Sequence, residues 1–438
     1  MRVDMDNLKA TEQENTVNSC PCETRKGADK RAVWLIVLCW LVYTCSYIGK
    51  LGYNANITQI ETQYGASHAN AGMVSTFFFF AYGIGQIVNG IFCKKYNIRY
   101  VVLGSLLLSG GMNLAVGFVR SFALLKYFWL VNGAALSVLW TSLIRLLSEN
   151  LDEKYMGRAV VVMGTTVATG TFLVYGLSAL FVAFTSFRAV FYTAGILLPV
   201  IAVIWLIFYP VLVRKKQPEK QAESPTINQN KGGRYALKSV LGVFIVLALY
   251  AIVNNLVKDG LTTWVPMILK DLYALPDYVS ILLTLLLPVL AIFGVTVAVW
   301  LHKKIKSFVA LGATLFLVST ALIGVVILLL PQKVFAVTLG CFALVSCLMS
   351  GVNNIVTSMV PLYWKDKINS GKAAGILNGF CYLGSTISSY GLGIIADHWD
   401  WTAVFWALLG LAFVATMVGF IYEMVQKIKV KPLKNSER

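Results

Sequence analysis

Charged side chains are scarce in this sequence. Asp, Glu, Lys and Arg together make up 13% of the 438 residues, whereas a soluble globular chain carries about 25%. Hydrophobic residues account for 58% of the chain, and its mean hydropathy is +0.71. These values exclude an ordinary soluble domain and predict a polytopic membrane protein.

Acidic residues and histidines are the scarcest polar groups. Asp and Glu total 20, only Asp259 falls well inside an apolar segment, and the three histidines lie at segment ends or in loops. Cys20-Pro21-Cys22 could supply two metal ligands but lacks two more, and the sequence has no nucleophile–base pair, so we expect no enzyme activity, no metal and no other cofactor. Proton-coupled symporters commonly relay protons through buried carboxylates, and the lack of a convincing relay favours anion exchange.

Long apolar runs, by contrast, are abundant. A transmembrane helix needs about 20 mostly apolar residues. Twelve segments meet this requirement, at about 33–59, 70–93, 99–119, 122–148, 158–182, 189–212, 239–269, 277–301, 307–330, 334–363, 372–396 and 401–425.

One polar, basic segment, 213–238, separates the first six runs from the last six. The two sides resemble each other, because the same offset of 214 positions separates Gly157 from Gly371 and Gly170 from Gly384. A duplicated six-span unit with a basic central loop is typical of two-bundle transporters, whose substrate site lies between the halves. The sequence therefore predicts an all-α membrane protein with twelve transmembrane helices in two pseudo-symmetric six-helix bundles.

This organisation divides the chain into five predicted segments. They are a disordered cytoplasmic tail at 1–32, an N-terminal bundle at 33–212, a cytoplasmic linker at 213–238, a C-terminal bundle at 239–425 and a second cytoplasmic tail at 426–438.

The charge distribution predicts the orientation of the chain in the membrane. A net charge of +17 would suggest a nucleic-acid partner in a soluble protein. Here 29 of the 37 lysines and arginines fall in the tails and loops that would be cytoplasmic if both termini were inside, which follows the positive-inside rule. We therefore expect a multi-pass plasma-membrane protein with both termini in the cytoplasm, a lipid bilayer around it, no nucleic-acid partner and a monomeric state.

Two lysines lie within apolar segments at matching places in the two halves, Lys50 in the first span and Lys258 in the seventh. A lysine at mid-membrane depth costs about 2.5–3.5 kcal/mol on insertion scales, so it marks a polar cavity or a functional site. Both lysines belong to polar stripes with helical spacing, formed by Tyr43, Tyr47, Lys50 and Asn54 in one span and by Tyr250, Asn254, Lys258 and Thr262 in the other. The pair predicts a binding site for an anion.

Alternative interpretations remain for several of these residues. Lys50 could instead extend to the interface from the end of its span. Asp259 could balance the charge of the empty cavity, or act in coupling. Arg145 and Glu149 have the i, i+4 spacing of an ordinary helical ion pair, which is favoured over a gating role for Arg145. The further candidate cavity-lining residues, each of which could equally pack or hydrogen-bond between helices, are Tyr47, Asn54, Tyr82, Gln86, Trp140, Asn254, Asn255 and Tyr382.

Several short motifs resemble those of a known family. They are Ala81-Tyr82-Gly83 with Gly90, Trp140 with Arg145, Trp264-Val265-Pro266, Gly371-Lys372-Ala373-Ala374-Gly375 and Tyr382-Leu383-Gly384. Together with the six-plus-six layout, from about residue 33 to residue 425, they resemble the major facilitator superfamily and, within it, the organophosphate:phosphate antiporters that carry glycerol phosphate and hexose phosphate.

The sequence departs from that family at the positions that would contact phosphate. The resemblance implies a phosphate held between two arginines, and the matching positions here are Lys50 and Lys258. A lysine is a point charge without the planar fork of arginine. The family's second-span lysine is Gln86 here, its fifth-span histidine falls near Thr166, and the superfamily's usual aspartate after span 2 is Lys94. The two lysines imply an anionic substrate without specifying a phosphate ester over a carboxylate or sulfonate.

The sequence thus predicts a secondary active transporter of a small organic anion, working by exchange with a counter-anion and by alternating access. One alternative is a proton-coupled carboxylate symporter that uses Asp259. Another is a transporter-like membrane sensor, because some relatives of these antiporters are receptors for sugar phosphates.

Overall fold

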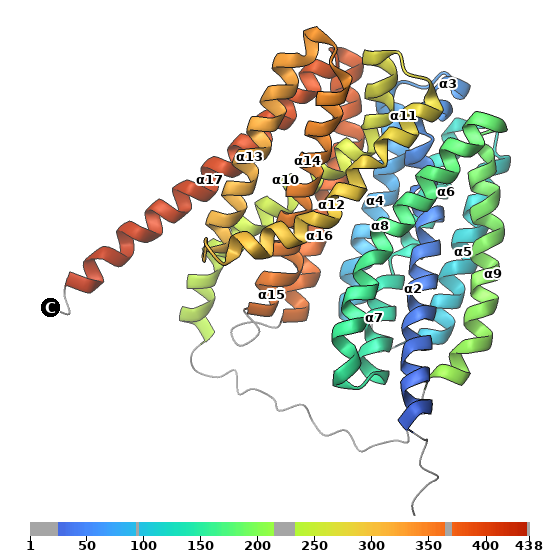
Figure 1. Cartoon of the computed structure of the whole chain (residues 1–438), viewed down its shortest axis with the longest axis horizontal. Helices are drawn as coiled ribbons and strands as arrows, with labels where there is room; N and C mark the ends of the chain where they lie inside the picture. Colours follow the sequence, from blue (N-terminus) through green and yellow to red (C-terminus); the bar gives the residue numbers. More distant parts are fainter. Residues whose placement is uncertain (1–24, 93–95, 214–232, 364–369, 436–438) are drawn as a thin grey trace, which may run out of the picture.

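The structure is a computed structural model that describes residues 25–92, 96–213, 233–363 and 370–435. Every regular element in these ranges is a helix. The first half of the chain, drawn in blue to green in Figure 1, contains α2 (Arg25–Ala55), α3 (Ile57–Tyr64), α4 (His68–Phe92), α5 (Ile98–Phe118), α6 (Phe122–Leu136), α7 (Leu139–Asn150), α8 (Glu153–Phe184) and α9 (Arg188–Leu212).

The second half, drawn in yellow-green to red, follows the basic segment. It contains α10 (Gly233–Tyr273), α11 (Asp277–Thr284), α12 (Leu286–His302), α13 (Phe308–Leu329), the 3₁₀ turn η2 (Leu330–Gln332), α14 (Phe335–Asn354), the π-helical turn η3 (Ile355–Met359), α15 (Val360–Tyr363), α16 (Ser370–His398) and α17 (Trp401–Asn435).

These helices form the predicted twelve-helix fold of two six-helix bundles. Within the described residues, eleven helical segments are long and apolar enough to cross a membrane. The remaining predicted span, 372–396, lies in α16, a 29-residue helix that carries many small and hydroxyl-bearing residues. Most of the predicted tail 1–32 and linker 213–238, together with Lys94, lies outside the described residues.

Two predicted spans are divided in the structure. The fourth is split into α6 and α7 around Ser137, whose hydroxyl donates to the carbonyl of Ala134 at 2.7 Å. The eighth is split into α11 and α12 at Leu285. Pro288 has no N–H with which to continue the α-helical ladder to the carbonyl of Thr284, which explains the break one turn earlier.

The two bundles meet along α4 and α16, which come from opposite halves. Glycines make this approach possible, because small residues let helices come close together. A Cβ at Gly72 would overlap the carbonyl oxygen of Ser389, and a Cβ at Gly83 would lie 2.9 Å from the Cβ of Tyr382. The lysine-bearing helices α2 and α10 are therefore brought to opposite sides of one interface between the halves.

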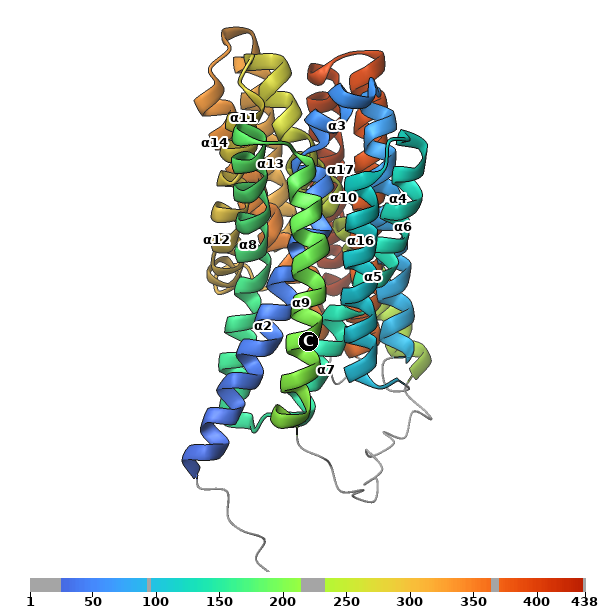
Figure 2. The same cartoon turned by 90° about the vertical axis from the view of Figure 1, so that its right-hand side faces the viewer.

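The molecule has two distinct ends. One, which we call the His68 end, holds the short helices α3 and α11 and lies at the top of Figures 1 and 2. The other, the linker end, holds the described residues that flank the basic segment, Val213 and Gly233. In Figure 1 the ribbons of the two halves lie close together at the His68 end and diverge toward the linker end.

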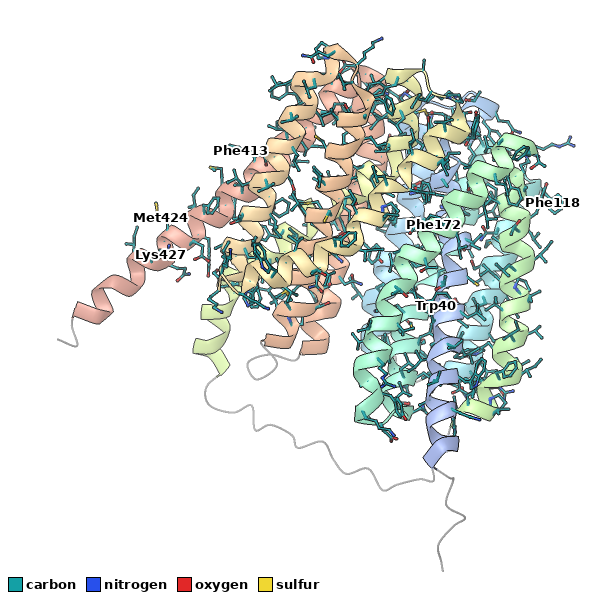
Figure 3. All side chains as sticks on the ribbon, viewed as in Figure 1. Trp40, Phe118, Phe172, Phe413, Met424 and Lys427 are labelled. Carbon is teal, nitrogen blue, oxygen red and sulfur yellow. The ribbon has the colours of Figure 1, made fainter. Side chains whose placement is uncertain are left out.

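The outer surface of the bundle is apolar. Phe118, Phe172, Phe413 and Met424 are 46–69% exposed, and Figure 3 shows the side chains of Phe118, Phe413 and Met424 pointing away from the helix bundle. Exposed apolar side chains over such an area would be unfavourable in water. They fit lipid contact, as expected of a multi-pass membrane protein.

Candidate functional site

Lys50 is buried among tyrosine rings from both halves of the molecule. Its side chain lies on α2, the residue is 8% exposed, and its Nζ lies 4.2 Å from the ring centroid of Tyr82 on α4. The corresponding distances are 5.1 Å to Tyr47, one turn earlier on α2, and 5.6 Å to Tyr382 on α16. Cation–π contacts of this kind contribute about 0.5–2 kcal/mol each. They hold the ammonium group between the halves instead of at the membrane interface.

The rings of Tyr82 and Tyr382 also contact each other, with centroids 4.7 Å apart. Gly83 allows this approach because it has no Cβ to meet Tyr382. Gln86 lies one turn beyond Tyr82 on α4 and is also buried, at 4% exposed. Lys50 is therefore surrounded by aromatic rings, and a buried amide lies one turn from the nearest of these rings.

Trp140 lies at the edge of this aromatic group. Its ring centroid is 4.8 Å from that of Tyr43, which is in turn 5.6 Å from that of Tyr47. Trp140 thus reaches the Lys50 surroundings through Tyr43, an arrangement that fits the packing role considered for it from the sequence.

Lys258 has different surroundings, because an acidic side chain accompanies it. Lys258 Nζ lies 3.6 Å from Oδ1 of the adjacent Asp259, and both side chains are about one quarter exposed. The sequence left this pairing open, since neighbouring residues on a helix point about 100° apart. The two side chains nevertheless bend toward each other on α10.

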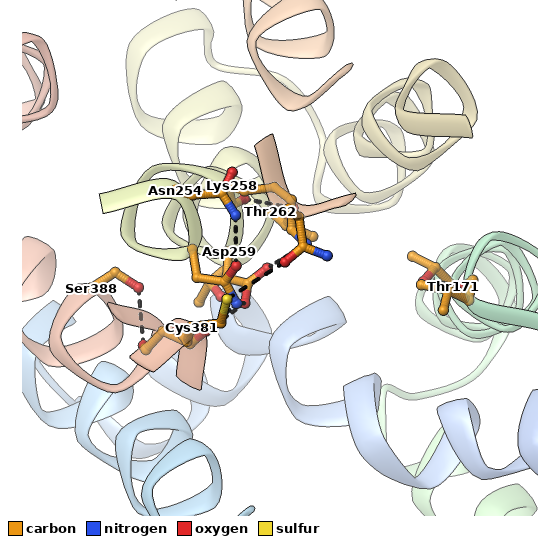
Figure 4. A network of polar contacts seen from close by, with 12 residues as sticks. Thr171, Asn254, Lys258, Asp259, Thr262, Cys381 and Ser388 are labelled. Carbon is orange, nitrogen blue, oxygen red and sulfur yellow. Dashed lines mark hydrogen bonds and ion pairs between the residues drawn. The ribbon is translucent and has the colours of Figure 1, made fainter. Parts of the chain in front are cut away.

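Asp259 is held by neutral donors from two helices. Ser385 on α16 donates to Asp259 Oδ2 at 2.5 Å, and Asn255 Nδ2 donates to the same oxygen at 3.2 Å. Figure 4 shows this network, with Lys258 and Asp259 on α10, Cys381 and Ser388 on α16, and Thr171 on α8 across from them. Sequence reasoning did not identify Ser385; the dense serines of α16 were the only available signal.

The two asparagines one turn before Lys258 belong to the same network. Asn254 Nδ2 donates to Asn255 Oδ1 at 2.9 Å. Asn254 Oδ1 is buried, and no donor of the described residues bonds to it. A buried polar atom without a partner costs about 1–3 kcal/mol, so this oxygen is available to a ligand or a water molecule.

Asn54 joins the two halves near the site. Its Nδ2 donates to Thr263 Oγ1 on α10 at 2.9 Å, and its Oδ1 accepts from Ser75 on α4 at 2.9 Å. With both groups of the amide occupied, Asn54 is an interhelical contact in this conformation.

We use "lysine site" below for Lys50, Lys258, Asp259 and the rings of Tyr47, Tyr82 and Tyr382.

Arg145 is not among the residues that surround the two lysines. Its Nε lies 2.8 Å from Glu149 Oε1 in an i, i+4 ion pair, and its guanidinium also donates to the carbonyl of Tyr96 at 3.4 Å. Both contacts lie on α7 and near the start of α5, toward the linker end (Figure 1). The geometry matches the ordinary ion pair indicated by the sequence.

A second polar cluster closes the His68 end, and the sequence analysis did not identify it. His68 Nδ1 lies 2.7 Å from Glu61 Oε1, and its Nε2 lies 3.9 Å from Asp271 Oδ2. Asp397 at the end of α16 accepts from the backbone N–H groups of His68 and Ala69 at 2.9 and 2.8 Å, where the N-terminus of α4 favours negative charge. Burial raises the pKa of the Glu61 carboxyl above its usual value, against the lowering effect of His68.

Comparison with known proteins agrees with this architecture. The family model described as Major Facilitator Superfamily matches residues 39–367. Solved structures with a similar fold include a bacterial homologue of the human lysosomal transporter Spinster in an inward-facing, unoccupied conformation (TM-score 0.72, 13% identity, 89% of this chain and 96% of that chain) and a D-xylose–proton symporter (TM-score 0.66, 13% identity, 88% and 97%).

Relatives with similar sequences cover nearly the whole chain. A "Probable hexose phosphate transport protein" of Chlamydia trachomatis is 20% identical over 429 residues, covering 91% of this chain and 94% of the relative. The "Membrane sensor protein UhpC" of Escherichia coli K12 is 21% identical over 392 residues, covering 85% and 87%. The family match, the helix order and the two-bundle structure together lead to one conclusion: the chain belongs to the Major Facilitator Superfamily.

Proposed function

We propose that this chain is a secondary active transporter of a small organic anion, and that Lys50 and Lys258 bind the anion between the two halves. The observation that carries the proposal is the position of Lys50. Its ammonium group is buried among tyrosines of both halves, and no carboxylate of the described residues forms an ion pair with it within 4.0 Å. A buried cation that lacks an anionic partner favours the binding of an anion.

The contacts of the lysine site support alternating access. Lys50 and Tyr82 belong to the first half, whereas Tyr382 and Lys258 belong to the second. An anion held by both lysines would draw the halves together, and their glycine-lined interface would allow them to rock about the site. The carboxyl group of Asp259 is already engaged by Ser385 and Lys258, which supports exchange of anions over transfer of a proton through this residue.

The charge asymmetry supports an orientation. The linker end lies next to the basic segments that hold most lysines and arginines, so it would face the cytoplasm of a plasma membrane. The His68 end would then be the outer end. The predicted division into bundles at 33–212 and 239–425, with cytoplasmic tails and a cytoplasmic linker, is part of this proposal, as is the monomeric state.

Exchange in proteoliposomes tests the proposal. Purified protein is reconstituted with glycerate, glycerol 3-phosphate or glycerol 3-sulfate inside, and uptake of the same labelled anion is followed. We expect uptake to need internal anion and to change little when a proton gradient is applied. A strict need for an inward proton gradient that Asp259→Asn abolishes would instead assign a proton-coupled carboxylate symporter.

A membrane sensor is the second candidate function, and the similarity to UhpC favours it. A sensor needs to bind its ligand without carrying it across the membrane. Specific binding of an anion by the purified protein, with no flux in liposomes of verified orientation and tightness, would replace the transporter proposal with the sensor.

A further inference from the structure

The two lysines are not electrostatically equivalent. Lys50 is surrounded by tyrosine rings, whereas Lys258 carries its own ion pair with Asp259 at 3.6 Å. The formal charge of the lysine site is therefore +1, not the +2 that two lysines alone would supply. This difference bears on which anions the site can neutralise.

Asp259 is held in place by groups other than Lys258. Ser385 Oγ and Asn255 Nδ2 both donate to Asp259 Oδ2, at 2.5 and 3.2 Å, while Lys258 lies nearer to Oδ1. Asn255 and Ser385 are also hydrogen-bonded to each other at 3.2 Å. An anion that binds Lys258 would therefore leave the Asp259 carboxylate hydrogen-bonded in the site.

The Asp259 network is continuous with the surroundings of Lys50. Tyr382, whose ring lies 5.6 Å from Lys50 Nζ, is one turn before Ser385 on α16. Residues three apart on a helix share a face, so α16 presents the tyrosine to Lys50 and the serine to Asp259 side by side. All three charges thus act on a ligand bound between the two lysines.

From this arrangement we propose that Asp259 is a fixed counter-anion that makes the site selective for singly charged organic anions, carboxylates or sulfur oxyanions, over doubly charged phosphate esters. A monoanion brings the site to neutrality. A dianion leaves a net negative charge in a low-dielectric site and is repelled by the retained carboxylate. The inference rests on the proposed function and names its substrate class.

Matched esters test the selectivity. Glycerol 3-phosphate and glycerol 3-sulfate have similar shapes, but above pH of about 6 the phosphate ester is mostly a dianion, whereas the sulfate ester stays a monoanion. Isothermal titration of the purified wild type at pH 7.5 should show the sulfate binding at least about tenfold more tightly. Equal affinities, or tighter binding of the phosphate, would overturn the inference.

Two variants separate the charge of Asp259 from its structural contacts. Asp259→Asn removes the charge and retains a similar shape, so the ratio of sulfate to phosphate affinity should fall by about tenfold or reverse. Ser385→Ala removes a hydrogen bond and leaves the charge, so the preference for sulfate should persist. An unchanged ratio in Asp259→Asn, or the same change of ratio in both variants, would contradict a role for the charge.

A titration of the wild type alone covers the case in which Asp259→Asn does not fold. Lowering the pH from 7.5 to 5 converts the phosphate ester to a monoanion, and its affinity should approach that of the sulfate ester. A constant affinity ratio over this range overturns the inference. If the wild type binds neither of these esters nor glycerate, the proposed function itself fails. If it binds both esters with equal affinity, the proposed function stands and only the inference about charge selectivity is overturned.

Discussion

At the scale of single residues, Lys50 shows how a costly charge is kept within a membrane span. Tyr82 and Tyr382 face it from α4 and α16, so its position depends on contacts from both halves. The sequence predicted Lys50 as a site residue from its place in a polar stripe of helical spacing, and it named the two tyrosines only as candidate cavity-lining residues. It left the proximity of Tyr82 to Tyr382 undetermined, because the two residues are 300 positions apart and nothing local in the sequence sets their distance.

The Tyr82 ring should matter to anion binding more than its hydroxyl group does. Tyr82→Leu removes the closest cation–π contact of Lys50 and should weaken anion binding about 2- to 30-fold, as the usual energy of such contacts implies. Tyr82→Phe keeps the ring and should bind nearly as tightly as the wild type. Titration of both purified variants with the anion checks this. A larger loss of anion affinity in Tyr82→Phe than in Tyr82→Leu would show that the hydroxyl group, not the ring, is important for binding.

At the scale of helices, the spans were well predicted from apolar length, and their internal breaks were not. The division of the eighth span at Leu285 follows from Pro288 and could have been anticipated. The division of the fourth span near Ser137 has no such local signal, because it occurs where Ser137 itself packs against Gly85 of the distant helix α4. The tight approach of α4 to α16 likewise depends on which residues of the opposite helix the glycines face, such as Ser389 opposite Gly72 and Tyr382 opposite Gly83.

Gly72 should be needed for contact between α4 and α16. Gly72→Ala would place a methyl group against the carbonyl oxygen of Ser389, and overpacking of this kind costs about 1–3 kcal/mol. We expect a lower thermal unfolding midpoint for this variant in detergent. Gly90→Ala on the same helix is the matched control, because nothing lies within 4 Å of its added Cβ. Equal unfolding midpoints for the two variants would show that the close contact at Gly72 contributes nothing to thermal stability.

At the scale of the whole molecule, the structure is closed at the His68 end by polar contacts between the halves. The four residues of this cluster, Glu61, His68, Asp271 and Asp397, each lie just outside one of the predicted spans. Nothing in the sequence indicated that they meet, because they come from segments up to about 330 residues apart. The halves meet at this end and diverge at the linker end. The lysine site described above belongs to this conformation.

Closure of the His68 end should depend on pH through Glu61. Burial raises the pKa of Glu61 in the closed state, and opening would hydrate the carboxyl and lower that pKa toward 4.5, its usual value. The closed state therefore binds the proton more tightly, is favoured as pH falls and loses stability as pH rises through the raised pKa. The same carboxyl faces three other titratable groups, His68, Asp271 and Asp397. These three groups are present in both the wild type and the Glu61→Gln variant that are compared below.

Distances between the halves can report this closure. Spin labels at Gln63 and Trp399, which are exposed on opposite halves at this end, should move apart in the wild type as the pH is raised. In Glu61→Gln the side chain no longer ionises, so the distance should respond less to pH. An undiminished response in Glu61→Gln would assign the titration to another group of the cluster.

The central claim is that Lys50 and Lys258 together bind the transported anion, and equilibrium binding tests it most directly. Isothermal titration compares the wild type with Lys50→Ala, Lys258→Ala and a control, Lys304→Ala, whose lysine lies over Trp300 at the end of α12. Removing one charged partner of a bound anion should weaken binding about 10- to 100-fold in each site variant, with the control unchanged. Wild-type affinity in either site variant, at equal folded yield, would contradict the account.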